Sequence, residues 1–250
     1  MWTPAALRCE ARPYAGPLWR VVEGQARAST LRLTESLRDQ QILEEEIESA
    51  KPRLPPGTAH LHPLLRTPFR YEPYPGGSRF RRAHQREGVF YGAERGATAI
   101  AEMAFYRLLF LAEAPGMTPP DRALEVTAFA VEVATEAVDL TQPPLEAGAA
   151  RWTDLVDYAA CQDLADIARG AAIGAIRYAS VRDPGGGCNV AVLDWRAFAA
   201  PEPAEVRTWH LLPRPCGAIA VREFPRLDLE FGHADFGADP RLRTLFADCP

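Results

Sequence analysis

The chain has 250 residues, with 28 basic and 33 acidic side chains and a formal net charge of −5. This acidic balance argues against a protein that binds nucleic acid directly through its overall charge. Because 47% of the residues are hydrophobic, the chain is expected to be globular, and its length predicts a single domain over residues 1–250. No apolar run is long enough to predict a membrane span.

The five cysteines lie far apart in the sequence, and none forms a CxxC or zinc-finger spacing. We therefore expect neither a metal site nor a redox pair among them. His60 and His62 alternate as two ligands on a strand would, but no third ligand lies nearby. An odd number of scattered cysteines is typical of a reducing compartment, and the N-terminus lacks the apolar core of a signal peptide. The sequence predicts a cytoplasmic protein without metal.

Periodicity and turn residues predict a mixed series of elements along the chain. Strands are predicted at 18–22, 89–91, 123–133 with a continuation at 138–140, 173–181, 188–193, 209–212 and 218–221. Helices are predicted at 27–50, 96–112 and 152–168. Residues 52–75 are rich in proline and predict an irregular connection, and the segment from Phe231 predicts a surface tail. This order favours an α+β fold with a core at about 17–224, an insertion at about 26–75 and a tail at about 225–250.

The run Gly185-Gly186-Gly187 has strands predicted on both sides. Dinucleotide-binding and phosphate-binding glycine loops require a helix after the loop, so this run predicts a hairpin turn instead. The sequence contains no GxSxG motif for a serine hydrolase.

The stretch 76–107 combines an arginine loop, a short strand and a helix. Arg79 lies in the loop, Tyr91 ends the strand, and Glu102 is the only acidic residue of the helix before Glu113. A carboxylate among apolar neighbours is costly to desolvate unless it is paired. Glu102 is therefore either a structural ion-pair partner or a functional residue.

Three further polar residues stand out against apolar strands. Ser180 ends one strand, Asn189 begins the next, and Arg20 interrupts the apolar run of the first strand. Two of them also have an ordinary structural interpretation: a strand-end hydroxyl for Ser180 and an outward-facing strand residue for Arg20. The same holds for Arg79 on a surface loop and Tyr91 in the core.

Taken in order, these segments resemble the RES-domain family, which is named for arginine, glutamate and serine. The resemblance is carried by LWRV at 18–21, GSRF at 77–80, GVFY at 88–91, TAIAE at 98–102, the strand 176–181 with Ser180, and NVAV at 189–192. It covers about residues 18–193. The chain departs from the family pattern in its long insertion before the arginine loop and in Arg81-Arg82 after Arg79.

This resemblance implies a toxin of a toxin–antitoxin pair, with a helix-turn-helix protein as antitoxin. It implies a largely antiparallel split sheet similar to ADP-ribosyltransferase toxins. It also implies consumption of NAD as a substrate, by hydrolysis, phosphorolysis or transfer of ADP-ribose, with no cofactor. The implied catalytic residues are Glu102, Arg79, Ser180 and Tyr91, and the implied NAD-binding residues are Arg20, Arg79, Tyr91 and Asn189. The phosphate contact is open among Arg79, Arg81 and Arg82, and a homo-oligomer is left open.

These residue types suit cleavage of the nicotinamide–ribose bond. Positive charge grows on the ribose as the bond breaks, and the Glu102 carboxylate would stabilise it. Arginine forks pair with pyrophosphate oxygens, Tyr91 could stack on nicotinamide, and Ser180 could position Glu102. The alternative hypothesis is a non-catalytic interaction protein that keeps the fold and binds a partner through the helix at 27–50, whose far end is acidic.

Overall fold

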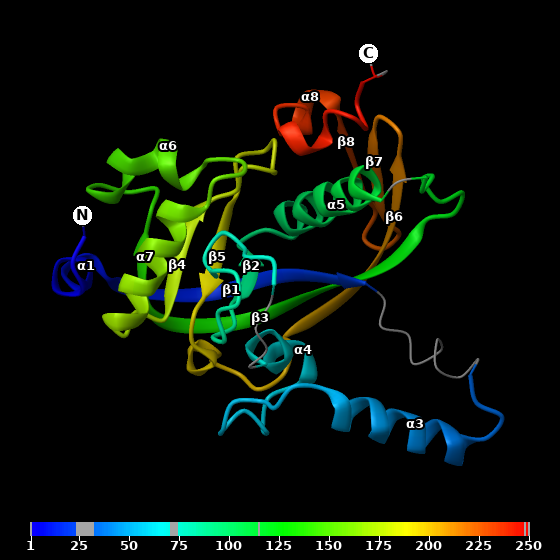
Figure 1. Cartoon of the computed structure of the whole chain (residues 1–250), viewed down its shortest axis with the longest axis horizontal. Helices are drawn as coiled ribbons and strands as arrows, with labels where there is room; N and C mark the ends of the chain where they lie inside the picture. Colours follow the sequence, from blue (N-terminus) through cyan, green and yellow to red (C-terminus); the bar gives the residue numbers. More distant parts are fainter. Residues whose placement is uncertain (1, 24–32, 71–74, 115, 248, 250) are drawn as a thin grey trace.

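The structure is a computed structural model that describes residues 2–23, 33–70, 75–114, 116–247 and 249. Its centre is an eight-stranded sheet with the order β1-β2-β5-β4-β3-β6-β7-β8 (Figure 1). The strands are β1 (Arg12–Glu23), β2 (Phe90–Ala93), β3 (Leu124–Asp139), β4 (Ala175–Ala179), β5 (Cys188–Val192), β6 (Glu205–Arg214), β7 (Gly217–Arg222) and β8 (Leu227–Gly232). All of the strand pairs are antiparallel except β3–β4. The predicted α+β class with a mixed, largely antiparallel sheet is confirmed.

Strand β3 connects the two halves of the sheet. It pairs with β1 over the whole length of β1, from Arg12↔Ala137 to Glu23↔Val126. Its first half also pairs with β6, and its last residues pair with β4. Because β1 also meets β2 at Trp19↔Ala93, strands β1, β2, β5, β4 and β3 form a closed ring. Strands β6 to β8 extend from this ring at β3.

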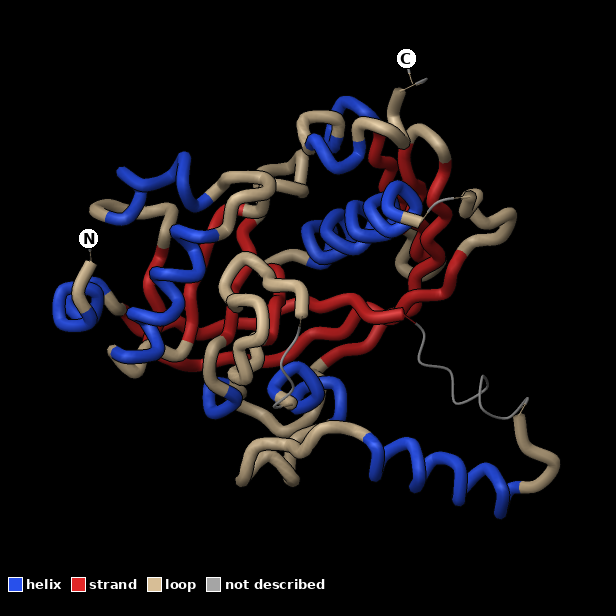
Figure 2. The backbone as a smooth tube through the Cα atoms, in the orientation of Figure 1, coloured by secondary structure: helices blue, strands red, loops and turns tan. Residues whose placement is uncertain are grey.

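Helices cover both halves of this sheet, as Figure 2 shows. The helices are α1 (Pro4–Glu10), α3 (Leu37–Ala50), α4 (Pro63–Arg66), α5 (Gly96–Glu113), α6 (Ala149–Trp152), α7 (Ala159–Gly170) and α8 (His233–Phe236). Short 3-10 turns are η1 (Thr67–Phe69), η2 (Leu145–Gly148), η3 (Trp195–Ala197) and η4 (Pro240–Leu242). Helix α5 packs on β1 and on β6 to β8, and α7 packs beside α1 and β4. The site lies against α5 and reaches Tyr158, just before α7.

The predicted connection at 52–75 is irregular apart from α4 and η1, and its residues 71–74 lie outside the described part. Leu61, Leu65 and Phe69 from this segment are buried against Phe90 and the strands of the ring. The segment therefore packs against the core although most of it has no regular structure.

The helix predicted at 27–50 begins later than expected. Residues 27–32 lie outside the described part, and α3 starts only at Leu37, where the Ser36 hydroxyl accepts a hydrogen bond from the Asp39 amide at 3.1 Å. Most of the described apolar residues behind the prediction do not face the core: Leu37 is 83% exposed, and Ile42 and Ile47 are exposed too. The apolar periodicity therefore predicted a helix that is present at Leu37–Ala50, but it did not indicate that most of its apolar side chains are exposed.

The helix predicted at 152–168 is interrupted. Helix α6 ends at Trp152 and α7 begins at Ala159. Between them the Asp154 carboxylate accepts hydrogen bonds from the Val156 and Asp157 amides at 2.9 and 2.7 Å. Short acidic side chains that bond to nearby amides compete with helix formation, which explains the break.

The expectation that the segment from Phe231 is a surface tail is wrong. Strand β8 adds the last strand of the sheet, and Phe231, Phe236, Leu242 and Phe246 are buried against α5 and strands β6 and β7. The aspartates and glycines of this segment suggested a surface position, but its phenylalanines are buried and anchor the segment to the core.

The sequence predicted no redox pair among the cysteines, and it did not indicate the disulfide that the structure contains. Cys216, in the turn between β6 and β7, forms a disulfide with Cys249, with 5.5 Å between their Cα atoms. The two residues are 33 positions apart, a spacing that matches no motif, so only the folded chain brings them together. Cys9, Cys161 and Cys188 are free.

The predicted strands are found with adjusted ends. Strand β3 continues without interruption to Asp139, and β6 extends over ten residues. Strand β4 ends at Ala179, so Ser180 is the first residue of the turn that follows.

Within the described residues no helix has both the length and the apolar character needed to cross a membrane.

Candidate functional site

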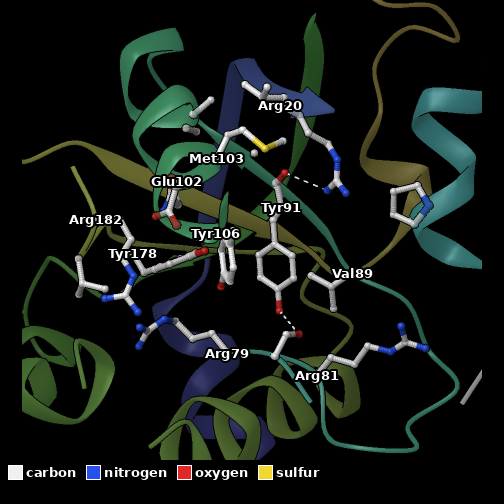
Figure 3. Close-up of a pocket in the computed structure, with 18 of the residues that line it drawn as sticks. Arg20, Arg79, Arg81, Val89, Tyr91, Glu102, Met103, Tyr106, Tyr178 and Arg182 are labelled. Carbon is white, nitrogen blue, oxygen red and sulfur yellow. Dashed lines mark hydrogen bonds between the residues drawn. The ribbon is translucent and has the colours of Figure 1, made fainter. Parts of the chain in front are cut away.

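A cavity of about 550 Å³ is lined by residues of α5, by the arginine loop and by Tyr158, the N-cap residue of α7 (Figure 3). Its volume falls in the range of roughly 300–1,000 Å³ that is usual for small-molecule sites. Five of the six residues predicted from the sequence line it: Arg20, Arg79, Tyr91, Glu102 and Asn189. The sixth, Ser180, contacts Glu102 directly.

Glu102 carries the carboxylate of the cavity. The Ser180 hydroxyl donates a hydrogen bond to its Oε1 at 2.7 Å, and the Asn189 amide donates to the same oxygen at 2.6 Å. Neither partner is charged, so Glu102 is not held in a structural ion pair by these contacts. They fix the carboxylate from one side and leave Oε2 with no hydrogen bond from the described residues.

The backbone around Ser180 determines the direction of its hydroxyl hydrogen. Its Oγ accepts hydrogen bonds from the amides of Arg182 and Asp183, each at 3.2 Å. A hydroxyl has one hydrogen to donate, and here Glu102 is the acceptor. Ser180 is buried, and it thus serves as a fixed donor to the carboxylate.

The arginine loop brings one guanidinium into the cavity in a defined position. Arg79 is only 8% exposed; its Nη1 donates to the Trp152 carbonyl at 2.7 Å, and its guanidinium lies 4.6 Å above the Tyr158 ring. Within the described residues it forms no ion pair with a carboxylate. The guanidinium of Arg79 is therefore buried and oriented by these contacts without a direct ion pair.

The other two arginines of the loop are held differently. Arg82 forms ion pairs with Asp163 and Asp166 on α7 and does not line the cavity. Arg81 lines it, but its Nε and Nη2 donate to the Gln85 carbonyl at 3.1 and 2.8 Å. In Figure 3 the Arg81 side chain extends away from Glu102, whereas Arg79 approaches the side of the pocket where Glu102 lies.

Tyr91 joins the arginine loop to strand β2. Its hydroxyl lies 2.8 Å from Ser78 Oγ and accepts a hydrogen bond from the Phe80 amide at 3.0 Å. Burial raises the pKa of this hydroxyl. The ring lines the cavity, while the hydroxyl is engaged in holding the loop that carries Arg79.

Arg20 enters the cavity from β1. Its Nη1 donates to the Tyr91 carbonyl at 3.1 Å, and its guanidinium lies 5.0 Å from the centre of the Phe90 ring (Figure 3). Burial lowers the pKa of Arg20 to about 10, so it remains a cation at neutral pH. The interpretation of Arg20 as a simple outward-facing strand residue does not fit this position.

Residues 53–213 match the sequence profile of the family described as RES domain. This chain belongs to the RES domain family. A search of curated proteins found no match. Among solved structures, the chain is similar to one in the crystal structure of the M. tuberculosis MbcT–MbcA toxin–antitoxin complex. That similarity has 10% sequence identity, covers 94% of each chain and has a TM-score of 0.45.

This RES chain also uses residues outside the matched segment to build its cavity. Asp239 and Arg241, like Arg20, lie beyond residues 53–213. Asp239 is 2% exposed and pairs with Arg182 at 2.9 Å and with Arg241 at 2.8 Å. Both arginines line the cavity. No pattern in the sequence pointed to them, because they meet only after the C-terminal segment folds onto α5.

The segment between α6 and α7 anchors three arginines of this RES pocket. The Leu155 carbonyl accepts hydrogen bonds from Arg182 Nη2 and Arg241 Nη2, both at 3.1 Å. Arg241 Nη2 also lies 3.4 Å from the Tyr158 hydroxyl, and the ring of Tyr158 lies below Arg79. The break in the predicted helix at 152–168 thus forms the basic wall of the cavity.

Tyr178 completes the surroundings of Glu102 in the RES pocket. Its hydroxyl group is buried, and burial together with the nearby Glu102 carboxylate raises its pKa well above the usual value. The phenol is therefore protonated and can donate a hydrogen bond inside the cavity.

Among the described residues no group of three or more His, Cys, Asp or Glu side chains could hold a metal ion.

Proposed function

We propose that this RES protein cleaves the nicotinamide–ribose bond of NAD and acts as a toxin that a cognate helix-turn-helix antitoxin neutralises. One observation carries the proposal: among the described residues, Glu102 is the only carboxylate that lines the cavity, beside five arginines, and Ser180 and Asn189 both donate to one of its oxygens. A single acid in a basic pocket suits a reaction in which an anionic substrate develops local positive charge.

The basic side chains suit the pyrophosphate of a dinucleotide. Arg79 and Arg20 are oriented by backbone carbonyls and lack an ion-paired acid among the described residues. Guanidinium forks bind phosphate oxygens in pairs, which makes these two arginines the proposed anchors of NAD. Tyr91 presents its ring to the cavity, where an aromatic face can stack on nicotinamide.

The carboxylate of Glu102 would act on the ribose. As the bond between the ribose carbon and the nicotinamide nitrogen breaks, its electron pair leaves with nicotinamide, which becomes neutral. The ribose gains positive charge, and an adjacent carboxylate stabilises it. An oxygen nucleophile then attacks that carbon and loses its proton. Water, inorganic phosphate and a protein side chain remain the three acceptors to be distinguished.

The test is release of nicotinamide from NAD by purified protein freed of its partner, with and without phosphate. ADP-ribose as product identifies water as acceptor, and ADP-ribose 1″-phosphate identifies phosphate. Label from NAD that is retained on protein identifies transfer to a side chain. A folded sample that releases no nicotinamide under any of these conditions contradicts the proposal.

A second candidate function is partner binding without catalysis, in which the RES fold serves as an interaction module. It is favoured by α3, whose apolar residues Leu37, Ile42 and Ile47 are exposed beside an acidic run from Glu44 to Glu48. This candidate predicts a tight complex with the antitoxin and no turnover of NAD. If overexpressed wild-type protein arrests growth and the Glu102→Gln variant does not, catalysis is the better account.

A further inference from the structure

The turn between β4 and β5 is organised by one carboxylate that touches neither the cavity nor Glu102. Asp183 Oδ1 accepts a hydrogen bond from the Gly185 amide at 2.8 Å, and its Oδ2 accepts from the Gly187 amide at 3.1 Å. The Ser180 amide donates to the Gly187 carbonyl at 2.8 Å and closes the turn. Ser180 thus enters this turn and Asn189 follows it, so Asp183 shapes the segment that carries both partners of Glu102.

The same carboxylate also binds the beginning of α5. The Thr98 hydroxyl donates to Asp183 Oδ2 at 2.6 Å, and Arg95 Nη2 donates to it at 2.8 Å. Arg95, the N-cap residue of α5, makes no side-chain capping bond, and the first turn of the helix contains no acid. Asp183 therefore supplies from another segment the negative charge that a helix N-terminus favours.

Thr98 and Glu102 lie four residues apart on α5, so their side chains share one face of the helix. Thr98 is fully buried, and the turn packs against it closely. A Cβ added at Gly187 would overlap both Thr98 Oγ1 and Asp183 Oδ2. The turn and the helix are thus fastened together one helical turn before Glu102.

We infer that Asp183 is a positioning residue that holds Ser180 and Asn189 opposite Glu102. It acts by tying the β4–β5 turn to the first turn of α5, because Glu102 is on one of these elements and its two donors are on the other. The inference deepens the proposed function and rests on it.

The test compares kinetics of Asp183→Asn and Asp183→Ala with those of a matched variant, Asp139→Asn. Asp139 accepts bonds from the Thr141 amide and hydroxyl and from Arg177, so it resembles Asp183 in chemistry but belongs to a separate cluster. Since small displacements of reacting groups cost up to about 100-fold in rate, we expect kcat for NAD cleavage to fall about 10- to 100-fold in both Asp183 variants. KM should change less than about threefold, because the arginines that bind the substrate keep their anchors.

Thr98→Val provides a second variant of nearly unchanged size, which removes the hydroxyl that donates to Asp183 and that accepts from Arg95 Nε at 3.4 Å. It should reproduce most of the fall in kcat, whereas Asp139→Asn should keep kcat within about twofold of wild type. Equal losses of kcat in Asp139→Asn and Asp183→Asn would show a general structural effect and overturn the positioning role. So would wild-type kcat in folded Asp183→Ala.

Amide hydrogen exchange separates this inference from the proposed function, because it requires no turnover. The amides of Arg182 and Asp183 bond to Ser180 Oγ, so their exchange should accelerate about tenfold in Asp183→Asn and not in Asp139→Asn. If wild-type protein releases no nicotinamide, the proposed function fails, and amide exchange alone then decides whether Asp183 positions the turn. Unchanged exchange at both amides in Asp183→Asn then overturns the inference.

Discussion

Ser180 Oγ lies 2.7 Å from Oε1 of Glu102 although 78 residues separate the two in the sequence. Two backbone amides hold the Ser180 oxygen from behind, and Asn189 holds the same oxygen of Glu102. The carboxylate is therefore fixed by neutral donors, which orient it without cancelling its charge. Such an arrangement keeps a negative charge available for a substrate that becomes positive.

Replacing Glu102 by glutamine removes this charge and keeps an oxygen that Ser180 and Asn189 can bond. We expect kcat for nicotinamide release to fall about 100- to 1,000-fold, the usual cost of losing one electrostatic contact to a transition state. The unfolding midpoint in urea should stay close to that of wild type. Glu125→Gln, on an exposed position of β3, is the control and should keep full activity. Full activity in Glu102→Gln would contradict the role assigned to the carboxylate.

Arg79→Lys tests the proposed substrate anchor. Lysine keeps the charge but loses the fork and the planar contact with the Tyr158 ring. We expect KM for NAD to rise about tenfold, with a smaller effect on kcat. Arg82→Lys is the matched control on the same loop, because Arg82 pairs with Asp163 and Asp166 away from the cavity. A similar KM in both variants would exclude Arg79 as the principal phosphate contact.

Ser180→Ala should affect both activity and stability. It removes one donor from Glu102 and leaves the amides of Arg182 and Asp183 without the oxygen they bond. We expect the free energy of unfolding to fall by about 1–3 kcal/mol, the cost of leaving buried polar groups unpaired. Chemical denaturation measures the first effect and nicotinamide release the second. A fall in stability at unchanged kcat would assign Ser180 a structural role only.

Asp239 should make the protein sensitive to acid. Burial alone would raise the pKa of this carboxylate, but its bonds to Arg241 and the charge of Arg182 lower it below the ordinary value of 3.8. The ion pairs therefore contribute their full stabilisation at pH values above the ordinary pKa of 3.8, which applies to the unfolded chain. This stabilisation is lost as the pH falls from 3.8 through the lower pKa that Asp239 has in the folded chain. Urea unfolding between pH 3 and 7 should show this loss in wild type.

The matching variant is Asp239→Asn, which leaves the buried guanidinium of Arg182 and the partly exposed guanidinium of Arg241 without their acid. At pH 7 its free energy of unfolding should be about 3 kcal/mol lower than that of wild type, as expected when one partner of a buried pair is removed. Its stability should also depend less on pH below 4. Identical pH dependence in the two proteins would show that another carboxylate is responsible for the acid sensitivity.

The Cys216–Cys249 disulfide should stabilise the C-terminal segment that carries Asp239 and Arg241. A bridge that closes a loop of this size typically contributes about 3 kcal/mol. Cys249→Ser should lower the free energy of unfolding by this amount, seen as a lower midpoint of unfolding in urea. Wild type treated with dithiothreitol should show the same lower midpoint. Cys9→Ser, at an exposed free cysteine, is the control. A midpoint that does not change with reductant would contradict a contribution from the bridge.

Local sequence patterns were sufficient to predict most of the elements on which the site is built. Alternating apolar residues indicated β3, and the apolar helix with its single early acid indicated α5 and Glu102. These features depend on a few neighbouring residues, so a sequence contains them directly. The order of the arginine, tyrosine, glutamate and serine segments was enough to suggest the RES family, which the match over residues 53–213 then established.

Only the tertiary structure decided which groups surround the carboxylate and which arginine of the loop enters the cavity. Arg79 and Arg82 are three residues apart and chemically identical, yet one meets Tyr158 and the other meets the acids of α7. Asp239 and Arg182 come from segments that appear unrelated in the chain. Their pairing follows from burial of the C-terminal aromatic residues on α5, and such long-range packing leaves no local pattern in the sequence.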